Sequence, residues 1–97
     1  MDNNQFLIGL AKIISAQSEV IGPVAYDLAQ NVPGLQFSDR KIISSVHGDQ
    51  RNILSALVKQ YSSLFGQSSV EICKDAIHSI NPPLDESLLP EELTFSN

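Results

Sequence analysis

The dipeptide Gly22-Pro23 constrains the fold of this chain more than any other part of the sequence. Glycine commonly ends a helix, and proline is tolerated in the first turn of the next helix, where its missing N–H needs no partner. Before the dipeptide, apolar residues recur at the three- and four-residue spacing of an amphipathic helix. They are Phe6, Leu7, Leu10, Ile13, Ile14, Val20 and Ile21. The sequence therefore predicts two helices, about 6–21 and 24–32, joined by a tight bend.

Two residues of the first predicted helix depart from this pattern. Ile8 lies off the apolar stripe, and the polar Gln17 lies within it. Ile8 is explained either by a second buried contact or by simple exposure to solvent, and the sequence favours neither.

A short third helix is expected after Pro33-Gly34. Ser38 is a suitable N-cap residue, and Asp39 would lie in the first turn, where the helix dipole favours an acidic side chain. This helix would end at His47-Gly48. Its inward residues would be Ile42, Ile43 and Val46.

Two longer helices are expected in the remainder of the body. Asp49 is a suitable N-cap for the fourth helix, Gly66 separates it from the fifth, and Asn81-Pro82-Pro83 ends the fifth near Ile80. The inner face of the fourth would carry Ile53, Leu54, Leu57, Val58, Tyr61, Leu64 and Phe65, and that of the fifth Val70, Ile72, Cys73, Ala76, Ile77 and Ile80. Tyr26 and Tyr61 are expected at the rim of the core with their hydroxyls in water. The predicted fold is a compact all-α bundle of about five helices over residues 1–80.

The two glycine joints lie 44 residues apart, and the residues around them agree. Leu10, Ile13, Ile14, Val20 and Ile21 align with Leu54, Leu57, Val58, Leu64 and Phe65, and Asp27-Leu28-Ala29 aligns with Glu71-Ile72-Cys73. The match indicates either two pseudo-repeated helix–Gly–helix units or a chance agreement between two amphipathic helix pairs.

Charge is unevenly distributed along the chain, whose net charge is −5. Residues 1–80 hold six basic and seven acidic side chains, whereas 81–97 hold four acidic side chains and no basic one. The body has no excess of positive charge, so we expect no nucleic-acid partner. No apolar run is long enough to span a membrane, the N-terminus lacks a basic signal-like start, and a single cysteine fits a reducing compartment. These features predict a cytoplasmic domain over 1–80 with an acidic, proline-containing, flexible tail over 81–97.

The segment Ile21-Gly22-Pro23-Val24-Ala25, after an amphipathic helix, resembles an aliphatic-Gly-Pro-aliphatic-Ala motif. The motif belongs to a poorly characterised helical domain appended to bacterial signalling proteins, beside serine/threonine kinase, response-regulator and cyclase modules. The resemblance covers roughly residues 6–80, and the second joint departs from it because Gln67 replaces the proline and Ser69 the alanine. It implies a regulatory or interaction role without chemistry, and it identifies no site residue.

Few residues suggest chemistry. His47 with Asp49 could be a base with its orienting group, but a helix end, a left-handed Gly48 and a capping Asp49 explain the same residues. His78 on a helix is typical of phosphotransfer domains, although the helix is expected to end directly after it. Cys73 lies on an apolar face, where a thiol behaves as a small hydrophobe. We therefore expect no enzyme activity and assign no catalytic, cofactor-binding or metal-binding residue.

The favoured function is a non-enzymatic protein–protein interaction module of bacterial cytosolic regulation that forms a homodimer. Its candidate contact residues are Ile8, Ile21, Gly22 and Pro23. In an alternative hypothesis the body is a scaffold and the tail a docking peptide that uses Leu88, Leu89, Leu93 and Phe95. A small-molecule sensor that uses the bundle interior is a third hypothesis.

Overall fold

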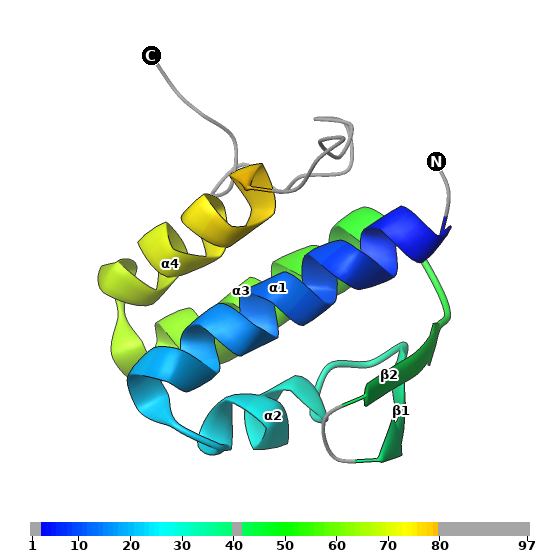
Figure 1. The fold of residues 1–97 in the computed structure, drawn as a ribbon, viewed down its shortest axis with the longest axis horizontal. Helices are drawn as coiled ribbons and strands as arrows, with labels where there is room; N and C mark the ends of the chain where they lie inside the picture. Colours follow the sequence, from blue (N-terminus) through cyan, green and yellow to red (C-terminus); the bar gives the residue numbers. More distant parts are fainter. Residues whose placement is uncertain (1–2, 40–41, 80–97) are drawn as a thin grey trace.

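Four helices and a two-stranded sheet make up the described part of the chain, residues 3–39 and 42–79 of a computed structural model. The elements are α1 (Asn3–Ile21), α2 (Val24–Ala29), β1 (Leu35–Asp39), β2 (Ile42–Val46), α3 (Gln50–Phe65) and α4 (Gln67–His78). In Figure 1, α1 and α3 run in the same direction, α4 and α2 lie on opposite sides of α1, and the hairpin lies beyond the end of α2. The prediction of a compact, mainly helical fold is confirmed.

The predicted third helix is wrong, because residues 35–46 form a β-hairpin instead. β1 and β2 pair antiparallel, with Leu35 opposite Val46 and Phe37 opposite Ile43, and the register shifts on both sides of Phe37. Leu35 is buried and Phe37 half-buried, while Gln36 and Ser38 are exposed. The β-branched side chains of β2 favour a strand because they pack well on a pleated surface. The fold is thus not purely α-helical, and the described helices number four.

The other predicted helices are present with small changes at their ends. α2 ends at Ala29, before the expected Val32, which is nevertheless buried in the turn that follows. The Asp49 carboxylate caps α3 by accepting the Arg51 N–H at 3.3 Å, as predicted. One hydrophobic core joins all the helices and the first strand. It contains Phe6, Leu10, Ile13, Ile14, Ala25, Ala29, Val32, Leu35, Ile53, Leu54, Leu57, Val58, Tyr61, Val70, Cys73, Ala76 and Ile77.

The two glycine joints have the same local geometry. Gly22 and Gly66 adopt φ of +82° and +77°, in the left-handed region that favours glycine. The Gly22 N–H donates to the Ser18 carbonyl at 2.9 Å, and the Gly66 N–H donates to the Ser62 carbonyl at 2.8 Å. The glycine N–H bond of one joint therefore has a counterpart 44 residues away in the other.

A pair of buried side-chain hydrogen bonds also follows the 44-residue offset. Gln17 donates from Nε2 to the carbonyl of Ser69 in α4 at 2.8 Å, and Tyr61 donates from its hydroxyl to the carbonyl of Ala25 in α2 at 2.8 Å. Gln17 corresponds to Tyr61 and Ala25 to Ser69, so each helix–Gly–helix unit donates to the equivalent carbonyl of the other. These bonds hold both joints at the same end of the molecule. Tyr61 is fully buried, which corrects its predicted place at the core rim.

Replacing Tyr61 with phenylalanine is expected to lower the free energy of unfolding by about 1–2 kcal/mol, because a buried hydrogen bond is lost while the ring stays packed. Urea unfolding followed by far-UV circular dichroism measures this as a lower midpoint with an unchanged slope. An unchanged midpoint would show that the bond to Ala25 contributes nothing to stability.

Candidate interaction surface

Four large apolar side chains are exposed at the end of the molecule that holds the two joints. Val20 and Leu64 are 65% and 63% exposed, and Val24 and Phe65 are 38% and 41% exposed. They come from the last turns of α1 and α3 and the first residue of α2. We call these four residues the joint-end patch. The sequence pattern placed Val20, Leu64 and Phe65 on inner helix faces, and the structure corrects that expectation.

The two most exposed residues of the patch occupy equivalent positions of the two units. Val20 and Leu64 are 44 residues apart, and each lies two residues before a joint glycine. Phe65 is the counterpart of Ile21, which is half-buried and packs against the core. The chain turns at both Gly22 and Gly66. The last turns of α1 and α3 are therefore not covered by the helices that follow them, and their apolar side chains remain in solvent. Three predicted contact residues, Ile21, Gly22 and Pro23, also lie at this end.

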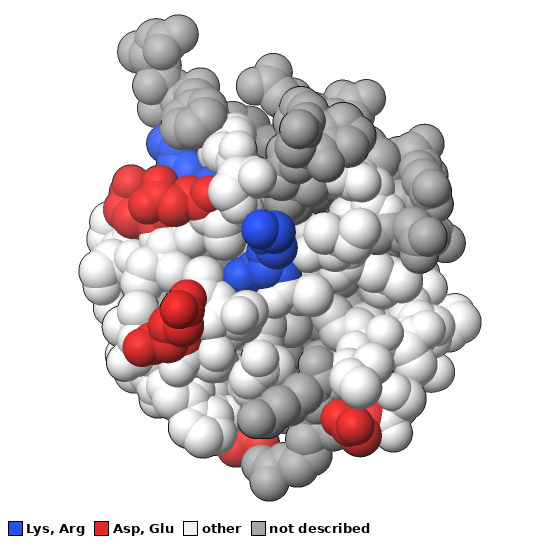
Figure 2. All heavy atoms as spheres, in the orientation of Figure 1, with Lys and Arg blue, Asp and Glu red and all other residues white. Residues whose placement is uncertain are grey.

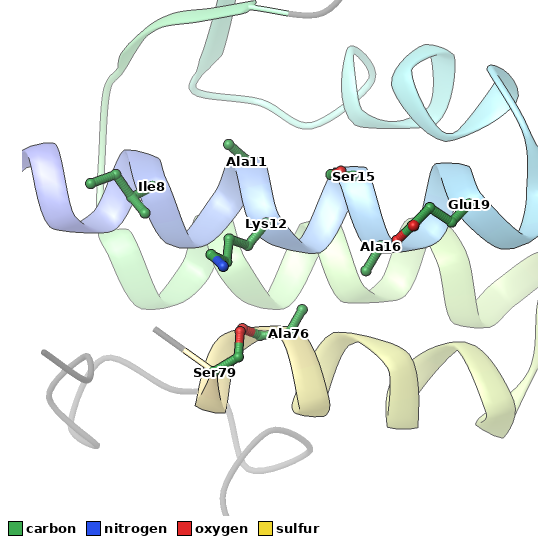
Figure 3. A pocket seen from close by; sticks show the side chains of 8 residues that line it. All are labelled: Ile8, Ala11, Lys12, Ser15, Ala16, Glu19, Ala76 and Ser79. Carbon is green, nitrogen blue, oxygen red and sulfur yellow. The ribbon is translucent and has the colours of Figure 1, made fainter. Parts of the chain in front are cut away.

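Ile8 belongs to a different surface, a groove between α1 and α4. The groove has a volume of about 460 Å³, and Ile8, which is 48% exposed, lies at one end of it (Figure 3). The lining residues are Ile8, Ala11, Lys12, Ser15, Ala16, Glu19, Ala76 and Ser79. The thirteen residues from Ile8 to Ile21 span roughly 20 Å of helix. The structure therefore does not bring Ile8 together with the joint residues.

The other predicted interaction residues, Leu88, Leu89, Leu93 and Phe95, lie outside the described residues. On the face shown in Figure 2, charged side chains of both signs are sparse, and most of the described surface is uncharged. With so few basic side chains, this face offers little attraction to a polyanion.

The polar cluster at residues 47–49 has a structural role. Gly48 adopts φ of +114° and Asp49 caps α3, as expected, but His47 follows a strand and not a helix. The His47 ring Nε2 lies 3.2 Å from the Ser45 hydroxyl on the same strand end, and the Asp49 carboxylate accepts a backbone N–H. The cluster therefore lacks the arrangement of a general base held by a carboxylate.

Cys73 is fully buried beside Gln17, whose Nε2 lies 3.2 Å from the thiol sulfur. Burial raises the pKa of the Cys73 thiol to about 11, and the hydrogen bond from Gln17 opposes that shift only in part. The thiol is protonated at neutral pH, so it is a poor nucleophile. Among the described residues, none donates a hydrogen bond to the buried Gln17 Oε1 atom, and an unpaired buried acceptor costs stability.

Stability is expected to fall as pH rises from about 9 to 11. The ordinary pKa of the thiol is 9.0 and its folded pKa is about 11. As pH rises, the unfolded state therefore loses the thiol proton first and is stabilised relative to the folded state. The full contribution of the thiol to the free energy of unfolding is present below pH 9, and about 2–3 kcal/mol of it is lost by pH 11. Burial also raises the pKa of Tyr61, which adds to the loss above pH 10.

Urea unfolding at pH 7, 9, 10 and 11 tests this expectation in the wild type and in Cys73→Ala. The variant is less stable at pH 7 because it leaves a small cavity, but its stability should decline less between pH 9 and 11. Equal declines in the two proteins would contradict the assignment to Cys73.

Within residues 3–39 and 42–79, no group of three His, Cys, Asp or Glu side chains is placed to hold a metal ion. No helix in the same ranges combines the length and apolar character needed to cross a bilayer. Comparison of the chain with family models, with curated proteins and with solved structures finds no match.

Proposed function

We propose that this chain is a non-enzymatic interaction module that forms a homodimer through the joint-end patch. The observation that carries the proposal is the exposure of four large apolar side chains at one end of a small domain. Scattered single apolar residues are ordinary on protein surfaces, but apolar residues gathered from three elements at one place are typical of an interaction site.

The make-up of the patch favours a second copy of the chain as the partner. In a twofold-symmetric dimer the same surface of each subunit meets its copy. We interpret the two helix–Gly–helix units as pseudo-repeats, because their joints and their exchanged hydrogen bonds follow one 44-residue offset. The patch then carries one equivalent apolar residue from each unit, Val20 and Leu64, and a patch of this kind can meet a copy of itself.

The dimer is expected to dissociate on dilution. A standard protein interface uses roughly 20–30 residues on each side, and the joint-end patch supplies four large apolar ones. Ile21, Pro23 and the polar residues around them would complete the contact. An exchanging dimer suits a regulatory role, and the resemblance of Ile21–Ala25 to a helical domain of bacterial signalling proteins is the ground for assigning the module to cytosolic regulation.

Nuclear magnetic resonance on dilution tests which surface associates. We expect the amide signals of residues 18–26 and 62–68 to move as the concentration is lowered, while those of Ile8, Lys12 and Ala76 stay in place. Movement confined to the α1–α4 groove would refute the joint-end patch, and no movement at any residue would refute self-association.

A further inference from the structure

The groove between α1 and α4 is shaped to receive large apolar side chains. Most of its wall consists of small residues, Ala11, Ser15, Ala16 and Ala76, which end at or just beyond Cβ and leave room above the two helices (Figure 3). Ile8 supplies a half-exposed apolar side chain at one end. The volume of about 460 Å³ lies in the range of pockets that bind small ligands or a few side chains.

A candidate occupant follows the groove directly in the sequence. Ser79 is the last described residue and lines the groove itself. The next eighteen residues contain six large apolar ones, Ile80, Leu84, Leu88, Leu89, Leu93 and Phe95. We propose that residues 84–95 of the same chain bind in the α1–α4 groove, with leucine side chains above the small residues and against Ile8.

The segment is long enough to reach the whole groove. Leu88 is nine positions after Ser79, a stretch of chain that can span up to about 30 Å. The lining residues of α1 run from Ile8 to Glu19, which is roughly 16 Å of helix. Because the segment is tethered at Ser79, its effective concentration at the groove is in the millimolar range, and a weak intrinsic affinity suffices to keep it bound.

Charge favours the same placement. Lys12 is the basic residue of the groove and lies at the Ser79 end, whereas Glu19 lies at the other end (Figure 3). Asp85 and Glu86 are the first acidic residues after Ser79 and enter beside Lys12. Bound in this way, the segment covers a surface that would otherwise be open to another protein. The inference goes beyond the proposed dimerisation, which uses the joint-end patch and not the groove.

Paramagnetic relaxation in the full-length protein tests the proposal. A nitroxide is attached at Ser15→Cys in the groove, while buried Cys73 remains unmodified. The amide signals of residues 84–95 are expected to lose most of their intensity. A nitroxide at Ser63→Cys, exposed near the joint end, should leave those signals sharp.

Matched variants show whether the leucines and Ile8 are responsible. Leu88→Asp with Leu89→Asp, or Ile8→Glu alone, should restore the signals, with the bound fraction reduced roughly five- to tenfold. Ser87→Asp, which adds a charge to the tail without removing an apolar side chain, should keep them weak. Sharp signals in the labelled wild-type tail, or no response to these variants, would overturn the proposal.

A mixed sample separates this proposal from dimerisation. Isotope-labelled wild-type chains are combined with unlabelled chains that carry the nitroxide at position 15. We expect the tail signals in this mixture to stay sharp, because each tail binds its own groove. Weakened signals would overturn binding within one chain and would assign the groove to the tail of a second copy.

Discussion

Replacing Gly34 with alanine is expected to lower the free energy of unfolding by about 3–5 kcal/mol, enough to unfold a domain of this size at modest temperature. Gly34 adopts φ of +93°, and a Cβ atom there would overlap the His47 carbonyl oxygen and lie 3.2 Å from Ile53 Cδ1. The overlapped atom belongs to the backbone at the end of the hairpin, where the His47 N–H donates to the Gly34 carbonyl at 2.8 Å. The backbone strain and the overlap each contribute roughly 1–3 kcal/mol.

Gly48→Ala is the matched control for this effect. Gly48 also has a positive φ, of +114°, but its nearest neighbour to an added Cβ is Ile53 Cδ1 at 4.0 Å. Only the strain of a positive φ remains, so we expect the free energy of unfolding to fall by about 1–2 kcal/mol. Thermal and urea unfolding followed by circular dichroism measure both variants, and equal losses would show that close approach to His47 does not explain the need for Gly34.

The double substitution Val20→Glu with Leu64→Glu is expected to weaken self-association by at least about 100-fold. Both side chains are more than 60% exposed in the monomer, so the substitutions should change the stability of the isolated chain little. In the dimer they would place four carboxylates in an apolar contact, where desolvation and mutual repulsion oppose association. Dilution calorimetry measures the dissociation constant of the wild type and the variant.

Ser63→Glu with Ser68→Glu provides the control for added charge. Both serines are exposed near the same end, and the pair adds the same charge without altering the joint-end patch. We expect it to weaken association only a few-fold and in a salt-dependent manner. A control as disruptive as Val20→Glu with Leu64→Glu would attribute the effect to net charge and remove the apolar patch as its cause.

The helical part of the fold was predictable because its signals are local. The apolar spacing of α1 and α3, the capping Asp49 and the two joint glycines each act within a few residues, and the structure confirms them. The 44-residue offset also proved informative, since it relates Gln17 to Tyr61, whose hydrogen bonds cross between the two units. That exchange depends on tertiary packing and could not be predicted from the spacing alone.

The hairpin was missed because its apolar residues fit two patterns. Ile42, Ile43 and Val46 suit one face of a helix as well as a short irregular strand, and the residues between the strands, Arg40 and Lys41, are not the glycine or asparagine typical of a tight turn. The stronger indicators were the β-branched side chains and the glycines at 34 and 48, which lie just outside the two strands.

The joint-end patch could not be predicted from periodicity. A helical pattern shows which side of a helix is apolar, but not where the neighbouring helix stops covering it. Val20 and Leu64 continue the inner stripes of α1 and α3. They are exposed because the chain turns two residues later, at Gly22 and Gly66. The sequence placed Ile8 off the apolar stripe, and in the structure its side chain is half-exposed in the groove. The structure was needed to show that this groove and the patch are separate surfaces.

Sedimentation equilibrium of the full-length wild-type chain over a wide concentration range tests self-association most directly. We expect a mass near twice 10.6 kDa at the highest concentrations that falls towards 10.6 kDa on dilution. A mass of 10.6 kDa at every concentration would contradict it, and the joint-end patch would then belong to a contact with a different protein.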